Sequence, residues 1–276
     1  MNEEFWKKVL LISGITFTAL FTSTPFIYMI IVSFAESADF LGRRTGFILT
    51  VENYIELFKN PNLHFLDYLR NSVVISGFSA FLTVLIASVA AYSITRLPFP
   101  SKSVFLMFVL GFSMFPQISI VGFLFNVMSK LGLINTYVGL ILPYTAWIMP
   151  LSLWILVSYF SGIPMEIDKQ ATIDGCTVWK TLFKVMWPLA KPGIFTTFIL
   201  AFIFAFNEFM FALLLTTDFR ARTVPVGIAL FQGLHGEIPW GTIMAASTVT
   251  TLPIVILIIV FQKNIIQGLT RGAVKG

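Results

Sequence analysis

Cysteine and histidine are nearly missing from this chain of 276 residues, and their scarcity excludes several kinds of site. The single thiol, Cys176, rules out an internal disulfide and a cysteine-rich metal site. The two histidines, His64 and His235, lie far apart in the sequence, so no histidine metal centre is expected. A Gly-x-x-x-x-Gly-Lys-Ser/Thr loop, which would cradle the phosphates of a nucleotide, is also absent.

Charged residues are scarce as well, and this decides the class of protein. They make up 11% of the chain, whereas an ordinary soluble domain has about 25%. Hydrophobic residues make up 57%, and the mean hydropathy is +0.88. A chain of this length and composition has lipid as its solvent. The composition therefore excludes a soluble enzyme and makes the lipid bilayer the first expected partner.

Six apolar stretches are long enough to cross a bilayer, which needs roughly 20 mainly apolar residues. They cover about Val9–Phe34, Ser72–Thr95, Val104–Val127, Tyr137–Phe160, Gly193–Thr216 and Gly241–Gln262. Each is continuous rather than alternating, which favours helices over barrel strands. The first is too long for a signal peptide's core and lacks a small-residue cleavage site, so we expect it to be retained. The pattern predicts an all-α, polytopic membrane protein with six transmembrane helices in a single domain, residues 1–276.

Lys and Arg are distributed unequally between the two sides of this topology. The side with both termini and residues 162–192 carries 11 of the 18, and the other side carries 7. With the acids outside the spans included, the two sides have net charges of +6 and 0. Because positive residues favour the cytoplasm, we expect both termini and residues 162–192 there, in a multi-pass protein of the cell membrane. Topology accounts for the basic total, and no nucleic-acid partner is expected.

A polar segment, Gly162–Pro192, separates two of the apolar stretches and is called the polar loop below. It is predicted to form two short helices that meet at Gly175. Pro164 suits the first turn of the first helix, and Glu166 and Asp168 follow where the helix dipole favours acids. That helix is expected to run to about Asp174, because Gly175 can take the left-handed conformation that ends a helix.

The second predicted helix begins after Thr177, a suitable N-cap. Its apolar residues share one face, and Lys180, Thr181 and Lys184 fall outside that face; the apolar set is Val178, Leu182, Val185 and Met186. Pro188 is expected to stop it. An amphipathic pair of helices outside the bilayer can dock in a groove of a partner protein or lie on lipid headgroups. The residue pattern by itself favours neither.

The polar loop resembles the EAA loop of permease subunits in binding-protein-dependent ABC importers. That loop has Glu-Ala-Ala, three residues, Gly, nine residues, Ile, one residue and Leu-Pro. The matching positions here are Lys169, Gln170, Ala171, Gly175, Val185, Trp187 and Pro188, with Asp174 as the acid that often precedes the Gly. The spacing agrees throughout. Lys169, Gln170 and Trp187 depart from the pattern, and Lys169 exchanges an acid for a base, so its charge contact is expected to be lost or re-paired.

The resemblance implies a multi-subunit complex. Two permease subunits form the pore, two cytoplasmic ATPase subunits bind ATP and Mg, and an extracytoplasmic sugar-binding protein delivers the solute. The EAA loop sits in a cleft of the ATPase and transmits its closure. The chain itself would be no enzyme and would bind no cofactor.

A second resemblance, to the carbohydrate-uptake branch, points to the smaller permease of maltose-type and trehalose-type systems. It rests on Thr50–Tyr54, Asn71-Ser72, Ala91–Ser93 with Arg96, Asn207–Phe209, Pro225–Gly227 and Gly268–Gly276. It implies import of an oligosaccharide such as maltose or trehalose. A permease for polyamine, phosphate or glycerol phosphate is the alternative. An integral-membrane enzyme would need convergent titratable residues, which Glu208 alone does not supply.

Polar residues inside the spans are candidates for the translocation path. Glu208, beside Asn207, is the acid within a span, and burying a charge there costs at least about 2.5 kcal/mol. It is expected either to line the path or to be a paired structural acid. Gln117 follows Pro116, which bends the third span, so Gln117 either faces the pore or satisfies the backbone at the bend.

Overall fold

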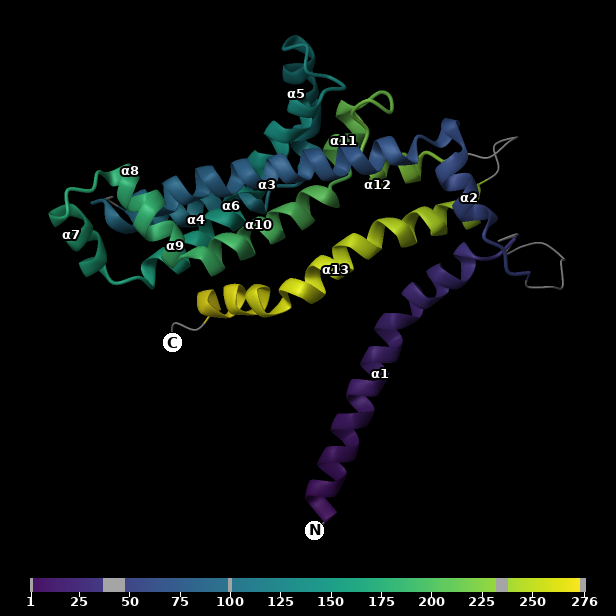
Figure 1. Cartoon of the computed structure of the whole chain (residues 1–276), viewed down its shortest axis with the longest axis horizontal. Helices are drawn as coiled ribbons and strands as arrows, with labels where there is room; N and C mark the ends of the chain where they lie inside the picture. The colour runs from purple at the N-terminus through teal and green to yellow at the C-terminus, as the bar shows by residue number, and fades with distance from the viewer. Residues whose placement is uncertain (1, 37–47, 99–100, 232–237, 274–276) are drawn as a thin grey trace. The chain divides into compact units, whose positions relative to one another are not determined.

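The computed structural model describes residues 2–36, 48–98, 101–231 and 238–273, and most of them are helical. No β-strand occurs in these ranges, although an isolated antiparallel bridge joins Ala35 to Leu49. The all-α fold class is therefore confirmed. The elements are α1 (Asn2–Ser33), α2 (Glu52–Lys59), the 3₁₀ helix η1 (Pro61–Leu63), α3 (Phe65–Arg96), α4 (Lys102–Ser113), α5 (Gln117–Lys130), α6 (Tyr137–Ser161), α7 (Met165–Ile173), α8 (Val178–Lys180), the π-helix η2 (Thr181–Met186), α9 (Trp187–Leu189), α10 (Lys191–Phe206), α11 (Met210–Leu215), α12 (Val224–Ala229) and α13 (Trp240–Ala273) (Figure 1).

Four of the described helices, α1, α3, α6 and α13, are long and apolar enough to cross a membrane. Up to six spans result if each of two bent helix pairs counts as one span. One such pair is α4 with α5, which meet at an angle of 86°. The bend falls immediately before Gln117, at the position of Pro116, as the missing backbone donor of proline predicts.

The fifth predicted span, Gly193–Thr216, is not one continuous helix. The helix α10 ends at Phe206, and α11 begins only at Met210. Asn207 and Glu208 lie in the gap, and both side chains bond to backbone groups around it. An apolar run hides this break because local polar side chains can satisfy the backbone groups that the interrupted helix leaves open.

The chain folds as two compact units, of which the first comprises residues 1–65 and 228–253. Here the side-chain amide of Asn53 on α2 donates to the carbonyl oxygens of Ser33 (3.0 Å) and Ala35 (2.9 Å). The start of α13 approaches the same side chain so closely at Gly241 that a Cβ there would overlap it. A single asparagine thus connects α2 with the end of α1 and the start of α13.

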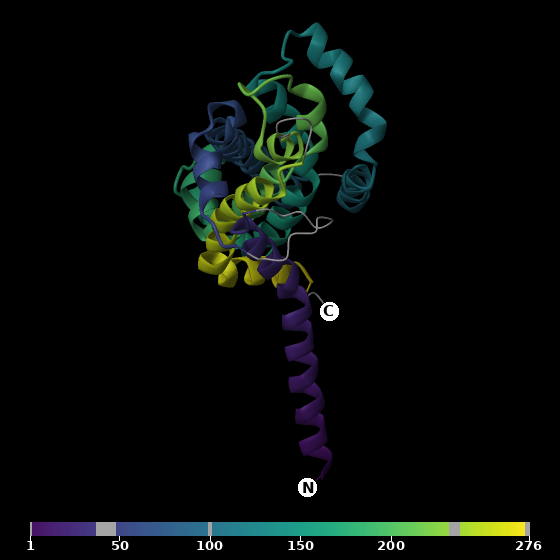
Figure 2. The ribbon, with the colours of Figure 1, turned by 90° about the vertical axis from the view of Figure 1, so that its right-hand side faces the viewer.

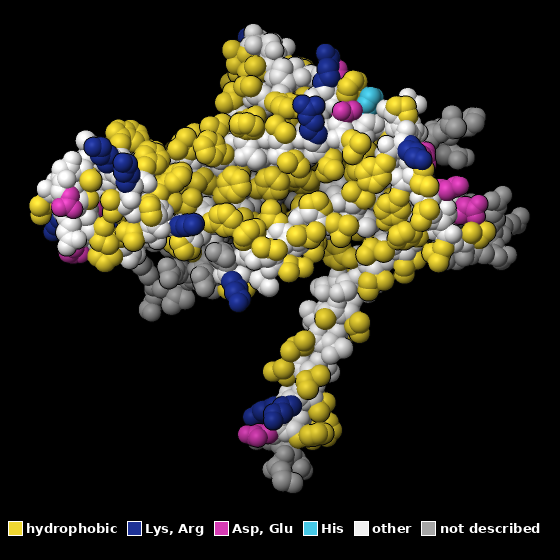
Figure 3. All heavy atoms as spheres, in the orientation of Figure 1, with side chains coloured by type: hydrophobic (Ala, Val, Ile, Leu, Met, Phe, Trp, Pro, Cys, Tyr) yellow, Lys and Arg dark blue, Asp and Glu magenta, His cyan; other side chains and the backbone are white. Residues whose placement is uncertain are grey.

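The second unit comprises residues 66–227 and 254–276. Its long helices α3, α6 and α10 lie side by side in both ribbon views (Figures 1 and 2). Two apolar clusters hold them together. One lies around Tyr144 and Phe211, and the other lies around Phe160 and Leu182. Hydrophobic side chains also cover the visible surface over α3 and α10, whereas Lys and Arg lie toward its two ends, beside α7 and α8 and near α11 (Figure 3).

Some residues that support the predicted orientation and the resemblance lie outside the described ranges. Among them are Arg43, Arg44 and Lys275, and His235, named in the metal-site argument, also lies outside them.

Candidate functional site

The first helix of the polar loop forms as predicted. The helix α7 starts after Pro164, and Glu166 and Asp168 lie in its first turn. Gly175 takes the left-handed conformation, with φ of +77°, and no atom lies within 4 Å of the place its Cβ would occupy. Glycine is therefore required at position 175 by the backbone conformation and not by a closely packed neighbour. The amide of Cys176 donates to the carbonyl of Ala171 (2.9 Å), which closes the helix end.

The second helix differs from its prediction. The side chain of Thr177 accepts from the amide of Lys180 (3.4 Å), which confirms the N-cap. The next turns form the π-helix η2, and its wider spacing buries Thr181 together with Leu182 and Met186 while it leaves Val178 exposed. Pro188 lies one residue before the end of the continuous helical segment Val178–Leu189, so the helix stops close to the predicted place. The chain bends between α9 and α10, where these helices meet at 85°.

The residues that match the EAA pattern differ in exposure. Ala171 is buried, and Val185 is half-buried. Lys169, Gln170, Asp174, Gly175 and Pro188 are exposed. Two large apolar side chains are exposed beside them, with 84% of Ile173 and 60% of Trp179 accessible. A polar loop with exposed apolar side chains has the composition of a docking surface.

A buried arginine fastens α7 to the helices of the bundle. Arg96, at the end of α3, has its Nε atom 3.0 Å from Oδ2 of Asp168 on α7. Its Nη2 atom donates to the carbonyl oxygens of Phe160 (3.0 Å) and Ile163 (2.8 Å) at the end of α6. The Arg96 side chain is 6% exposed and that of Asp168 is 18% exposed. One guanidinium therefore joins α3, α6 and the polar loop.

Glu208 holds the start of α11. Its two carboxylate oxygens accept hydrogen bonds from the amides of Phe211 (2.8 Å) and Ala212 (3.2 Å). These are donors that a helix start leaves without a partner, so the Glu208 carboxylate caps α11 from the position before its N-cap residue, Phe209. Asn207 is exposed and donates to the carbonyl of Ile203 (2.8 Å). Gln117 is half-buried at the start of α5. Their assignment to a translocation path stays a prediction.

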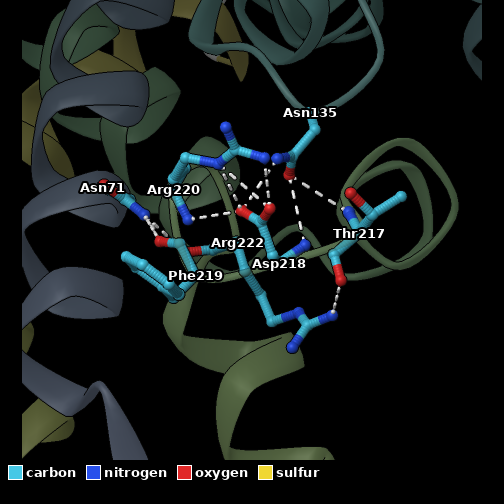
Figure 4. A network of polar contacts seen from close by, with 7 residues as sticks. All are labelled: Asn71, Asn135, Thr217, Asp218, Phe219, Arg220 and Arg222. Atoms are coloured by element: carbon cyan, nitrogen blue, oxygen red, sulfur yellow. Dashed lines mark hydrogen bonds and ion pairs between the residues drawn. The ribbon is translucent and has the colours of Figure 1, made fainter. Parts of the chain in front are cut away.

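A second polar network fixes residues 216–224 (Figure 4). They are called the outer turn below, after the side of the membrane that the Lys/Arg distribution predicts for them. Asn135, at a left-handed position between α5 and α6, donates to Asp218 (2.8 Å) and accepts from the amide of Thr217 (3.1 Å). The guanidinium of Arg220 binds the Asp218 carboxylate with both Nε and Nη2. These hydrogen bonds, with those from Arg220 first, lower the pKa of Asp218 well below its usual range.

Asn71, at the start of α3, ties the outer turn to that helix. Its amide donates to the carbonyl oxygens of Phe219 (2.8 Å) and Arg222 (3.0 Å), and its oxygen accepts from the Tyr137 hydroxyl. The hydroxyl of the next residue, Ser72, accepts from the amide of Val224 (2.8 Å). The role of this pair was not predicted from spacing, because its partners lie between 66 and 152 residues away.

Comparisons with known proteins agree with this architecture. Residues 83–271 match the family described as "Binding-protein-dependent transport system inner membrane component". The chain belongs to this family.

Two curated relatives are similar over most of the chain. A trehalose/maltose transport system permease protein of Thermococcus litoralis is 54% identical, and the match covers 100% of both chains. A trehalose transport system permease protein of Mycobacterium tuberculosis is 42% identical over 83% of each chain. A solved bacterial ABC transporter involved in alginate import has the same fold, with a TM-score of 0.80, 19% identity and coverage of 95% of this chain and 98% of that one.

Membership of this permease family gives the described geometry a context. The polar loop, with its exposed Ile173 and Trp179, lies within the matched residues, as do Arg96 and Glu208. Relatives of this kind are transport permeases and not enzymes. The chain is therefore a membrane permease subunit and not itself an enzyme.

Proposed function

We propose that this chain is a permease subunit of an ABC importer that moves a trehalose- or maltose-type sugar into the cytoplasm. The observation that carries the sugar is the 54% identity over the full length with a trehalose/maltose permease. The polar loop is the observation that supports transport driven by an ATPase. The chain has no nucleotide-binding loop of its own, so ATP and Mg belong to two separate ATPase subunits.

The polar loop is the proposed docking element for an ATPase subunit. Ile173 and Trp179 flank the break at Gly175 and point their apolar area away from the chain's own core. Such residues supply the anchors when a helix enters a groove. Lys169, Gln170, Asp174, Val185 and Pro188 belong to the same proposed contact. The exposed Lys169 favours an acid of the partner where the EAA pattern has Glu, because opposite charges steer and align two surfaces.

The remaining partners are proposed from the family. Its description as binding-protein-dependent supports an extracytoplasmic sugar-binding protein, and a second permease subunit would complete the pore. The outer turn is the proposed contact for the binding protein, because its exposed Arg220 and Thr217 are held by an ordered network. Orientation follows the Lys/Arg imbalance, with both termini and the polar loop in the cytoplasm.

Docking is tested by Gly175→Val, with Gly132→Val as the matched control. Both glycines have positive φ, +77° and +67°, and no atom lies within 4 Å of either Cβ position. Each substitution therefore adds only backbone strain, about 1–3 kcal/mol. Gly175→Val should abolish pull-down of the ATPase and sugar uptake, while Gly132→Val should retain pull-down. Unchanged pull-down and uptake in a normally inserted Gly175→Val chain would refute docking through the polar loop.

The substrate is tested with the complex reconstituted in proteoliposomes. Its ATPase activity in the presence of the binding protein should rise with trehalose or maltose. Stimulation by polyamine, phosphate or glycerol phosphate, with none by either disaccharide, would replace the sugar assignment by that alternative.

Orientation is tested with a membrane-impermeant thiol reagent in intact cells. Cys176, half-buried in the polar loop, should label only after permeabilisation. A cysteine introduced at the exposed Thr217, in a Cys176→Ser background, should label without it. The opposite pattern would reverse the topology and remove the ATPase from the side of the polar loop.

A further inference from the structure

We propose that Arg96 is a positioning residue that transmits movement of the polar loop to the membrane helices through Asp168. This inference rests on the proposed docking of that loop to the ATPase. It goes further because it assigns the internal connection by which a displaced α7 would move the bundle.

The geometry gives Arg96 three attachments. Its Nε lies 3.0 Å from Oδ2 of Asp168, and its Nη2 donates to the carbonyl oxygens of Phe160 and Ile163. Asp168 belongs to α7, Phe160 to the last turn of α6, and Ile163 lies two residues after that helix ends. The two Nη2 hydrogen bonds lie in the fixed plane of the guanidinium fork, which the point charge of a lysine cannot reproduce, and the Nε contact with Asp168 is an ion pair.

Burial makes this connection stiff. With 6% and 18% of the two side chains exposed, neither charge can move into water without rearrangement of the helices around it. Separating a buried pair leaves an uncompensated charge, whereas moving the pair as a unit does not. A displacement of α7 is therefore passed to the end of α3 and the end of α6 rather than absorbed in the linker.

The sequence of α7 separates this role from docking. Asp168 is turned toward Arg96, while the neighbouring Lys169 and Gln170 are exposed. The acid at 168 therefore serves the chain's own interior, and the residues after it remain for a partner. Glu166, in the same first turn, is exposed and provides a matched control.

The test compares Asp168→Asn with Glu166→Gln in the complete reconstituted transporter. Each change removes one carboxylate charge with little change of shape. Three quantities are measured: ATPase bound in pull-down, ATP hydrolysed, and sugar imported per ATP. For Asp168→Asn we expect normal pull-down but a fall of about two- to thirtyfold in sugar imported per ATP, the range known for mutations that alter coupling. Glu166→Gln should leave that ratio unchanged, and Asp168→Glu should restore part of it.

The outcomes separate this inference from the docking proposal. If Asp168 is purely structural, Asp168→Asn should lower the amount of assembled complex and leave the sugar imported per ATP by the remaining complexes unchanged. That result would overturn the inference. Arg96→Lys serves if Asp168→Asn fails to assemble, because it keeps the charge and loses the fork; an unchanged ratio there has the same meaning. Failure of docking itself is seen separately, as unaltered ATPase pull-down in Gly175→Val.

Discussion

The two ends of α3 hold distant segments with the same geometry but different chemistry. At one end, Arg96 donates to the carbonyls of Phe160 and Ile163, which are three residues apart. At the other end, Asn71 donates to the carbonyls of Phe219 and Arg222, which are also three residues apart. Asn71 and Arg96 are 25 positions apart, which is about 38 Å along the helix.

The difference lies in what each side chain carries besides these two bonds. Arg96 adds a buried charge pair with Asp168, whereas Asn71 adds a neutral bond from the Tyr137 hydroxyl. The charged residues of the outer turn, Asp218 and Arg220, pair with each other over two positions and remain accessible. A buried long-range pair resists separation, while an exposed local pair mainly shapes its own loop. The contact of Arg96 with Asp168 therefore makes the polar loop move together with α3, whereas the contact of Arg220 with Asp218 keeps the outer turn in its shape.

The largest effect should come from breaking the charged end. Arg96→Met leaves the Asp168 carboxylate buried without its partner, which should lower the stability of the chain by roughly 3–5 kcal/mol. Asn71→Leu leaves two carbonyls and a hydroxyl unsatisfied, and a loss of about 1–3 kcal/mol is expected. Thermal unfolding of the purified complex measures both.

Arg96→Met combined with Asp168→Leu removes both charges and should recover most of the lost stability, because apolar replacements of a buried pair are often tolerated. No recovery would mean that the two carbonyl bonds, and not the charge pair, distinguish this end of α3.

Two glycines of the second unit each pack closely against a tyrosine ring, one near each end of that unit. A Cβ at Gly193 would overlap the ring of Tyr159, and one at Gly227 would overlap the ring of Tyr68. Either glycine changed to alanine should cost about 1–3 kcal/mol through overpacking. Tyr159→Leu should relieve the Gly193→Ala defect, and Tyr68→Leu the Gly227→Ala defect, in thermal unfolding. Relief by the tyrosine of the opposite end would contradict these contacts.

Glu208 should have a smaller effect on stability. Glu208→Gln replaces one of the two acceptor oxygens with an amide nitrogen and so removes one of the two capping bonds to α11. A loss of about 1 kcal/mol is expected, with unchanged sugar uptake per assembled complex. Uptake that falls while assembly and unfolding temperature stay at wild-type values would instead place the carboxylate in the translocation path.

The sequence was sufficient for the helices and the turn at Gly175, because long apolar runs and a left-handed glycine are local signals. It was insufficient for the break at Asn207–Phe209, where polar side chains interrupt a helix that hydrophobicity alone would continue. It also did not show the π-helix η2, whose wider turns change which side chains before Pro188 are buried. Arg96 and Asn71 stand in stretches that resemble the sugar branch, but their partners are 64 or more residues away and only the fold brings them together.

The smallest predicted effect tests whether the outer turn depends on charge at all. Its hydrogen bonds from Arg220 and Asn135 lower the pKa of Asp218 in the folded chain. A carboxyl whose pKa is lower when folded stabilises the fold above its unfolded pKa, about 3.9, and loses that contribution as pH falls toward the folded value. Asp218→Asn should therefore unfold at a slightly lower temperature than wild type near neutral pH. The gap should close as the pH drops below about 4. A gap that stays constant with pH would show that the shape of residue 218, rather than its charge, orders the turn.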